Sequence, residues 1–232
     1  MKVSVNTLYW KDNNPLIEQI HSKIMKKFDI PINYTIENVH HGVWIDHILN
    51  TINSDIYVFF DGDCVPLTRN AFDEAIQHCV NGYLVGNAHV TNCIKAKHDL
   101  FCGAAFLVIN KSYYEKIKKP SAIGNKRSDI AQEFTRAAID LELRLKMNFP
   151  TTFQDLPSGG IWRLSGYGYY GVGTIYDEKI YHLWQSRFSK NVELFENTGN
   201  CILNEDLLSI KRPYNCRAEY AGIFPIEDDH GY

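Results

Sequence analysis

The sequence predicts an α/β fold in which helices flank a mostly parallel β-sheet. Short runs of β-branched and aromatic residues alternate with segments of helical spacing, which is the pattern of strand, helix and strand units. Residues 55–60, DIYVFF, form a continuous apolar run, as expected of a strand that is buried on both faces. The chain of 232 residues is long enough to bury the core of one such domain.

The first half of the chain predicts three strands, each followed by a helix. The strands are expected at residues 3–9, 32–37 and 55–60, and the helices at about 15–28, 40–52 and 70–80. Asn14 and Pro15 supply an N-cap and a first-turn proline for the first helix, and Asn70 is the expected cap of the third.

The second half predicts a less regular arrangement. Strands are expected at 83–90, 103–110 and 179–185, and helices near 111–118 and 129–147. We expect a single domain over 1–232, in which residues 1–100 bind the nucleotide and residues 101–232 meet the acceptor.

The composition limits the classes of partner and compartment. A formal net charge of -3 provides no overall basic field, so nucleic acid is not an expected partner. Neither a signal peptide nor an apolar run of about 20 residues is found, so we expect a cytoplasmic protein without a membrane span. Six cysteines without a CxxC pair are expected to be reduced, buried thiols.

The segment VFFDGDC carries the most specific chemical signal. Ligands of open α/β sheets bind beyond the carboxyl ends of the strands, and Asp61 and Asp63 follow such an end. Both carboxylates can reach a hard divalent cation, which neutralises a departing diphosphate. The alternative is a plain Asp-Gly turn, but the buried strand before it and the helix after it favour a functional site.

The chain resembles the GT-A class of nucleotide-sugar-dependent glycosyltransferases. The resemblance covers most of residues 1–187 and rests on the segments VNTLYW, HGVWIDHIL, SDIYVFFDGDCVPL, FCGAAFLVINKSYYEKI and IYHLWQSR. It implies a GT-A, Rossmann-like fold. The compact size is similar to that of the stand-alone transferase domains of large DNA viruses.

The resemblance also implies roles for individual residues. Asp61 would lie near the ribose and a metal-bound water, Asp63 would bind the metal directly, and His182 would complete the metal shell. Arg187 would contact the diphosphate. The remaining nucleotide-binding positions are expected at Thr7, Tyr9, His41, Gly42 and Asp46. For Tyr9 strand-end packing is the alternative, and for Asp46 it is a solvated helix position.

The general base of the reaction has two candidates. An inverting transferase needs a carboxylate within hydrogen-bond reach of the acceptor hydroxyl. Asp129 stands where GT-A enzymes place an acidic acceptor-side residue, although a helix N-cap completed by Gln132 is an equal alternative. Asp155 is the second candidate. The chain lacks the glutamate-aspartate pair of many inverting members, so the stereochemistry is open.

Residues 158–173 combine six glycines with four aromatic residues, Trp162, Tyr167, Tyr169 and Tyr170. Aromatic faces suit sugar rings, and glycines are typical of mobile lids, so we expect a lid or an acceptor contact. A tyrosine-rich hairpin packed on the core is the alternative.

These observations together predict a glycosyltransferase. The expected donor is a nucleoside-diphosphate sugar, with uridine as the nucleoside, and the expected cofactor is Mn²⁺ or Mg²⁺. The expected acceptor is a hydroxyl of a carbohydrate. The alternatives are a nucleotidyltransferase of related fold, a DNA-directed glycosyltransferase and a catalytically silent sugar-binding domain. The segment TLYWKDNNP lacks the glycine-rich, basic phosphate loop of a nucleotidyltransferase.

Overall fold

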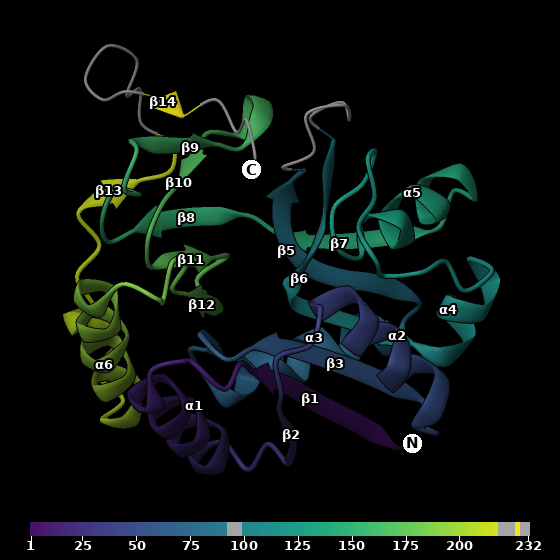
Figure 1. Cartoon of the computed structure of the whole chain (residues 1–232), viewed down its shortest axis with the longest axis horizontal. Helices are drawn as coiled ribbons and strands as arrows, with labels where there is room; N and C mark the ends of the chain where they lie inside the picture. The colour runs from purple at the N-terminus through teal and green to yellow at the C-terminus, as the bar shows by residue number, and fades with distance from the viewer. Residues whose placement is uncertain (92–98, 218–225, 228–232) are drawn as a thin grey trace.

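The computed structural model describes residues 1–91, 99–217 and 226–227, and it has the predicted mixed α/β architecture (Figure 1). A six-stranded sheet of order β2-β1-β3-β6-β5-β7 forms its centre. Its strands are β1 (Val3–Tyr9), β2 (Ile32–Ile36), β3 (Ile56–Asp61), β5 (Tyr83–Val90), β6 (Leu100–Asn110) and β7 (Arg144–Asn148).

This central sheet is mostly parallel, as predicted. The pairs β1–β2, β1–β3 and β5–β7 are parallel, whereas β6 runs antiparallel to both of its neighbours, β3 and β5. The carboxyl ends of the five other strands therefore meet the amino end of β6 at one edge of the sheet. Side chains at these ends are brought together there.

Helices cover both faces of the central sheet. The helices α2 (His41–Thr51), α4 (Lys111–Lys116) and α5 (Gln132–Asp140) pack on one face. The helices α1 (Pro15–Lys27), α3 (Arg69–Val80) and α6 (Ser189–Leu203) bury their apolar sides in the core of the other face. In Figure 1, α1 and α6 lie side by side.

The described residues also form two smaller sheets. One has the order β13 (Tyr214–Asn215), β8 (Pro150–Phe153), β11 (Thr174–Tyr176), β12 (Ile180–His182) and β4 (Cys64–Pro66). The other has the order β10 (Tyr169–Tyr170), β9 (Ile161–Arg163) and β14 (Ile226–Glu227). Two short 3-10 helices cover Ser165–Tyr167 and Leu207–Ser209. Because β4 comes just after Asp63, the five-stranded sheet joins the central sheet at the Asp61–Asp63 turn.

The predicted elements of the first half are confirmed, apart from one helix cap. The side chain of Asn14 accepts a hydrogen bond from the Leu16 N–H and caps α1, as predicted. The assignment of Asn70 as the cap of α3 is wrong. The hydroxyl of Thr68 accepts the Ala71 N–H instead, while the Asn70 amide donates to a glutamate within the helix.

One prediction in the second half is also wrong, and one helix was not predicted. The helix expected over 129–147 ends at Asp140, because Glu142 takes a left-handed conformation with φ of 54°. The chain then enters β7, which pairs in parallel with β5. Helix α6, over Ser189–Leu203, was not expected from the sequence.

Residues 158–173 form the packed tyrosine-rich hairpin that was the alternative to a lid. Strands β9 and β10 pair in an antiparallel arrangement, Tyr170 is buried, and Tyr167 is exposed. A Cβ atom at Gly168 would collide with the carbonyl oxygen of Cys216, and φ at Gly168 is 106°. This glycine is therefore explained by a close backbone approach and a left-handed conformation.

Five of the six cysteines are free thiols in the described residues, while Cys93 lies outside them. Among the described helices, none combines the length and the apolar character that crossing a membrane requires.

The corrected cap of α3 can be tested by a pair of alanine substitutions. Thr68→Ala is expected to lower the free energy of unfolding by about 1 kcal/mol, because it removes a side-chain acceptor from the first turn. The control Asn70→Ala removes only an exposed contact within the helix and should change it by less than about 0.5 kcal/mol. Urea denaturation measures both; a larger loss for Asn70→Ala would restore the original assignment.

Candidate functional site

Strand pairing brings His182 beside the two aspartates. Strand β3 ends at Asp61, and β4 begins at Cys64, so that Asp63 lies in the turn between them. Strand β12 pairs with β4 so that His182 stands opposite Cys64. The Leu183 N–H then donates to the Asp63 carbonyl oxygen at 3.0 Å, which extends the pairing to the turn. Residues 120 positions apart thus meet at the edge of the central sheet.

The three side chains form a compact group of oxygen and nitrogen ligands. The His182 Nε2 atom lies 3.3 Å from Asp63 Oδ1 and 3.9 Å from Asp61 Oδ2. One ligand atom from each residue lies within 4.8 Å of the other two. Two carboxylates and an imidazole are a suitable ligand set for Mn²⁺ and similar divalent cations. The residues present therefore fit the cation that the resemblance implies.

The two carboxylates differ in their electrostatic surroundings. Burial raises the pKa of Asp61, the charge of Asp63 adds to this effect, and His41 and His182 oppose it. Burial also acts to raise the pKa of Asp63, but a hydrogen bond from His182, the charge of that ring and a contact with Ser186 lower it overall. Asp63 is therefore the more strongly ionised of the two and is the better anchor for a cation.

Gly62 is required by a close contact with Tyr9. A Cβ atom at position 62 would lie only 2.5 Å from a ring carbon of Tyr9, which lies against the turn. The Tyr9 hydroxyl is 2.7 Å from His21 Nδ1, and the Tyr9 ring stacks on Tyr34 with a centroid separation of 5.5 Å. The buried Tyr9–His21 pair thus supports the Asp61–Asp63 turn from behind.

A cavity of about 160 Å³ lies beside the cluster of Asp61, Asp63 and His182. It is lined by the ends of several elements, and its residues are His41, Asp61, Asn87, Ala88, His89, Phe101, Gly103, Ala104, Ala105, Asp129, Ile130, Tyr176, His182 and Trp184. Asp61 and His182 belong both to the ligand cluster and to the cavity wall. A molecule bound to a cation at the cluster can therefore extend into this cavity.

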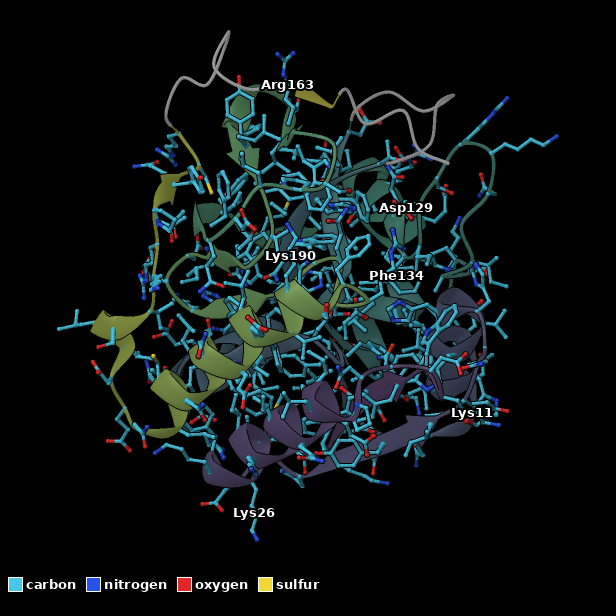
Figure 2. All side chains as sticks on the ribbon, turned by 60° about the vertical axis from the view of Figure 1, so that its left-hand side comes forward. Lys11, Lys26, Asp129, Phe134, Arg163 and Lys190 are labelled. Carbon is cyan, nitrogen blue, oxygen red and sulfur yellow. The ribbon has the colours of Figure 1, made fainter. Side chains whose placement is uncertain are left out.

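The two candidate bases occupy different places. Asp129 lines the cavity, and its Oδ2 atom lies 3.9 Å from His89 Nε2. Figure 2 shows Asp129 amid the packed side chains, whereas Arg163 and Lys26 extend from the edge of the molecule. Asp155 does not line the cavity; its carboxylate accepts the Leu156 N–H and faces Lys190 at 3.4 Å. Asp129 alone of the two can approach a substrate in the cavity.

Asp129 is not the residue that directly precedes α5, although the Gln132 half of the predicted capping box is formed. The helix begins at Gln132, and the residue before it, Ala131, is in a left-handed conformation. The Gln132 side chain accepts the Asp129 N–H, and the Asp129 carboxylate accepts the Ile130 N–H. These bonds fix the loop that presents Asp129 to the cavity.

Of the predicted nucleotide-binding residues, His41 lies at the cluster, with its Nε2 atom 3.4 Å from Asp61 Oδ1. Thr7 and Tyr9 lie in the interior with exposed fractions of 0% and 1%. The Thr7 hydroxyl donates to the Phe60 carbonyl oxygen, so its partner is a neighbouring strand. The packing alternative considered for Tyr9 describes its surroundings in the structure.

Gly42, Asp46 and Arg187 lie outside the cavity wall. A Cβ atom at Gly42 would lie 2.6 Å from the Ala122 carbonyl oxygen, so the glycine permits α2 to approach this loop. The Asp46 carboxylate, on a partly exposed position of α2, accepts hydrogen bonds from the Ser121 hydroxyl and the Ala122 N–H and so anchors this loop. The guanidinium of Arg187 is exposed and lies over the Phe188 ring.

The sequence analysis did not identify Asn87, His89 and Trp184. Asn87 and His89 are polar residues at alternate positions of an otherwise apolar strand, and this spacing places them on one face of β5. Polar residues within an apolar strand can be recognised from the sequence alone, so Asn87 and His89 could have been chosen as candidates. Trp184 gives no comparable signal, and it adopts an unusual left-handed conformation with φ of 52°.

No protein-family model matches the chain. No curated protein matches it either. Among solved structures, the chain is similar to A197 from STIV, with a TM-score of 0.42, 18% identity and coverage of 62% of this chain and 80% of that one.

Two further solved structures have names of enzymes that handle nucleotides. A putative glucose-1-phosphate thymidylyltransferase from Bacillus anthracis has a TM-score of 0.42, 12% identity and coverage of 63% and 86% of the two chains. A CMP:2-keto-3-deoxy-manno-octonic acid synthetase has a TM-score of 0.39, 8% identity and coverage of 64% and 90%. TM-scores this low support no conclusion about the activity of this chain.

The buried His21 predicts loss of stability in acid. Burial lowers its pKa to about 3, below the value of 6.5 for an exposed histidine. As the pH falls below about 6.5, only the unfolded chain takes up this proton, so the free energy of unfolding decreases. Between about pH 7 and pH 5, we expect the loss to be about 2 kcal/mol smaller in His21→Leu than in the unsubstituted protein. Urea denaturation at both pH values measures this difference.

The exposed His47 provides the control, because His47→Gln should leave the acid-dependent loss unchanged. Equal losses in His21→Leu and the unsubstituted protein would contradict a neutral, buried His21.

Proposed function

We propose that this chain is a metal-dependent glycosyltransferase whose donor is a nucleoside-diphosphate sugar. The observation that carries the proposal is the convergence of Asp61, Asp63 and His182 at the carboxyl edge of the central sheet, beside a cavity. Ligands of open α/β sheets bind at such edges. A uridine nucleotide, Mn²⁺ or Mg²⁺ and a carbohydrate hydroxyl as acceptor complete the proposal.

Each residue of the site has a definite task in this proposal. Asp61, Asp63 and His182 would hold the divalent cation, which neutralises negative charge on a departing diphosphate. Asp129 would accept the proton of the acceptor hydroxyl as the sugar carbon is attacked. The aromatic rings Phe101, Tyr176 and Trp184 line the cavity and would contact the apolar faces of the donor sugar.

Nucleotidyl transfer is the second candidate, and the loop after β1 argues against it. That loop, residues 10–14, contains one lysine and no glycine. Its backbone is tied to the end of β2, because the Lys11 N–H donates to Asn38 and the Asn38 amide donates to Asp12. The loop therefore lacks the glycine-rich, basic sequence whose backbone cradles a triphosphate.

Removal of one metal ligand tests the proposed cation site. In calorimetry with UDP, Mn²⁺ is expected to strengthen binding to the unsubstituted protein, and Asp63→Ala should reduce the Mn²⁺-dependent affinity at least about tenfold. Asp140→Ala, at the exposed end of α5, is the matched control and should bind as before. An affinity for UDP that changes neither with Mn²⁺ nor in Asp63→Ala would refute the cation site.

The products of the reaction separate the two enzyme classes. A glycosyltransferase releases a nucleoside diphosphate, whereas a nucleotidyltransferase releases pyrophosphate from a nucleoside triphosphate. Release of pyrophosphate would favour the second candidate. Transfer of sugar to DNA, or binding of UDP-sugars without any product, would favour the DNA-directed enzyme or the silent sugar-binding domain.

The role of Asp129 is tested by an isosteric substitution. Asp129→Asn keeps an oxygen for the Ile130 N–H but cannot accept the acceptor's proton, so kcat should fall by about 10²–10⁴. The affinity for UDP should stay unchanged, since Asp129 is not a ligand of the cation. Asp155→Asn provides the comparison: a larger fall in kcat for this variant than for Asp129→Asn would assign the base to Asp155.

A further inference from the structure

Three buried residues of the cavity wall carry polar atoms without hydrogen-bond partners. Asn87, His89 and His182 are exposed by only 3%, 9% and 2%, and all three line the cavity. Among the residues that the structure describes, the Nδ2 atom of Asn87 and the Nδ1 atoms of both histidines find no partner. Buried polar groups are normally paired, and each unpaired one costs about 1–3 kcal/mol. These atoms are therefore available to hydrogen-bond a molecule in the cavity.

The orientation of Asn87 leaves hydrogen-bond donors for such a ligand. The Asn148 amide nitrogen donates to the Asn87 Oδ1 atom at 3.3 Å. This bond occupies the oxygen of Asn87 and leaves its NH₂ group unpaired. Asn148 lies on β7, outside the cavity wall, so it acts on the cavity only through Asn87.

The size of the cavity suits one six-membered ring. Gly103, Ala104 and Ala105 of β6 form part of its wall, and their small side chains leave the space open. The Trp184 ring adds a flat aromatic face, tilted against His89 at a centroid distance of 5.0 Å. The volume of about 160 Å³ is close to the roughly 150 Å³ of an engineered cavity that holds one benzene ring.

The charges around the cavity do not favour an anionic ligand group. None of the described residues in its wall is a lysine or an arginine, and two of them, Asp61 and Asp129, are acidic. Burial lowers the pKa of His89 to about 4, so this ring is uncharged near neutral pH. With Asp61 engaged by the proposed cation, a carboxylate in the cavity would still meet the acidic Asp129 and no lysine or arginine of the wall.

We infer that this cavity binds the sugar ring of the donor, and that it selects a neutral monosaccharide without an N-acetyl or carboxylate substituent. The NH₂ group of Asn87 donates to a ring hydroxyl, and His89 bonds a second one. Hydroxyl groups both donate and accept, so they match these atoms. The inference rests on the proposed function, because the diphosphate at the cation positions the ring beside Asp61 and His182.

Calorimetry in the presence of Mn²⁺ tests this selection, with UDP, UDP-glucose, UDP-N-acetylglucosamine and UDP-glucuronic acid as probes. For the unsubstituted protein, UDP-glucose is expected to bind at least about tenfold tighter than UDP, because its hydroxyls pair buried groups. The N-acetylated and carboxylated sugars should gain no such advantage. Equal affinities for all four probes, or a preference for either substituted sugar, would overturn the inference.

Substitutions assign the selection to particular residues. Asn87→Ala should weaken binding of UDP-glucose about tenfold and leave binding of UDP unchanged, a difference that a merely structural role would not produce. Ala105→Val, which narrows the cavity without removing a polar group, should also weaken only UDP-glucose. Asn81→Ala, at an exposed helix end, is the matched control. If both cavity variants weaken UDP and UDP-glucose equally, the ring does not occupy this cavity.

The outcomes also separate this inference from the proposed function. Absence of any Mn²⁺-dependent binding of UDP would refute both. Mn²⁺-dependent binding of UDP that is lost in Asp63→Ala, together with no gain from the glucose ring, would retain the cation site and overturn the sugar subsite alone.

Discussion

The pairing of β12 with β4 is the interaction on which the candidate site depends. The two aspartates are neighbours in sequence, but His182 reaches them only because β12 aligns it opposite Cys64 and the Leu183 N–H bonds Asp63. A shift of this register by one residue would turn the imidazole to the other face of the sheet. The short strands of the five-stranded sheet therefore position the candidate site as well as completing the fold.

The reversed direction of β6 explains why a cavity lies next to the aspartates. Because β6 is antiparallel to β3 and β5, its amino end meets their carboxyl ends, and Gly103 comes to lie beside Asn87. The small residues of β6 leave space where the polar residues of β5 end. A bulky apolar pair at the same place would fill the cavity and bury Asn87 against hydrocarbon.

Local sequence signals predicted much of the fold, but only part of the site. Asn14 was recognised as a cap because its partner lies two residues away, whereas helix α6 and strand β7 depend on packing partners far along the chain. Asp61 and Asp63 were found from a strand end, a local feature. The choice of His182 among nine histidines rested on the family resemblance, since strand register between distant segments leaves no local pattern.

Backbone conformations next to the candidate site lower the stability of the fold. Trp184 and Gln185 both adopt left-handed conformations directly after the His182 strand, and such conformations cost about 1–3 kcal/mol each for residues with side chains. The fold tolerates these penalties because two large apolar cores and a buried central sheet surround the site. A ligand that hydrogen-bonds Asn87, His89 and His182 would bind the folded state and so raise the free energy of unfolding.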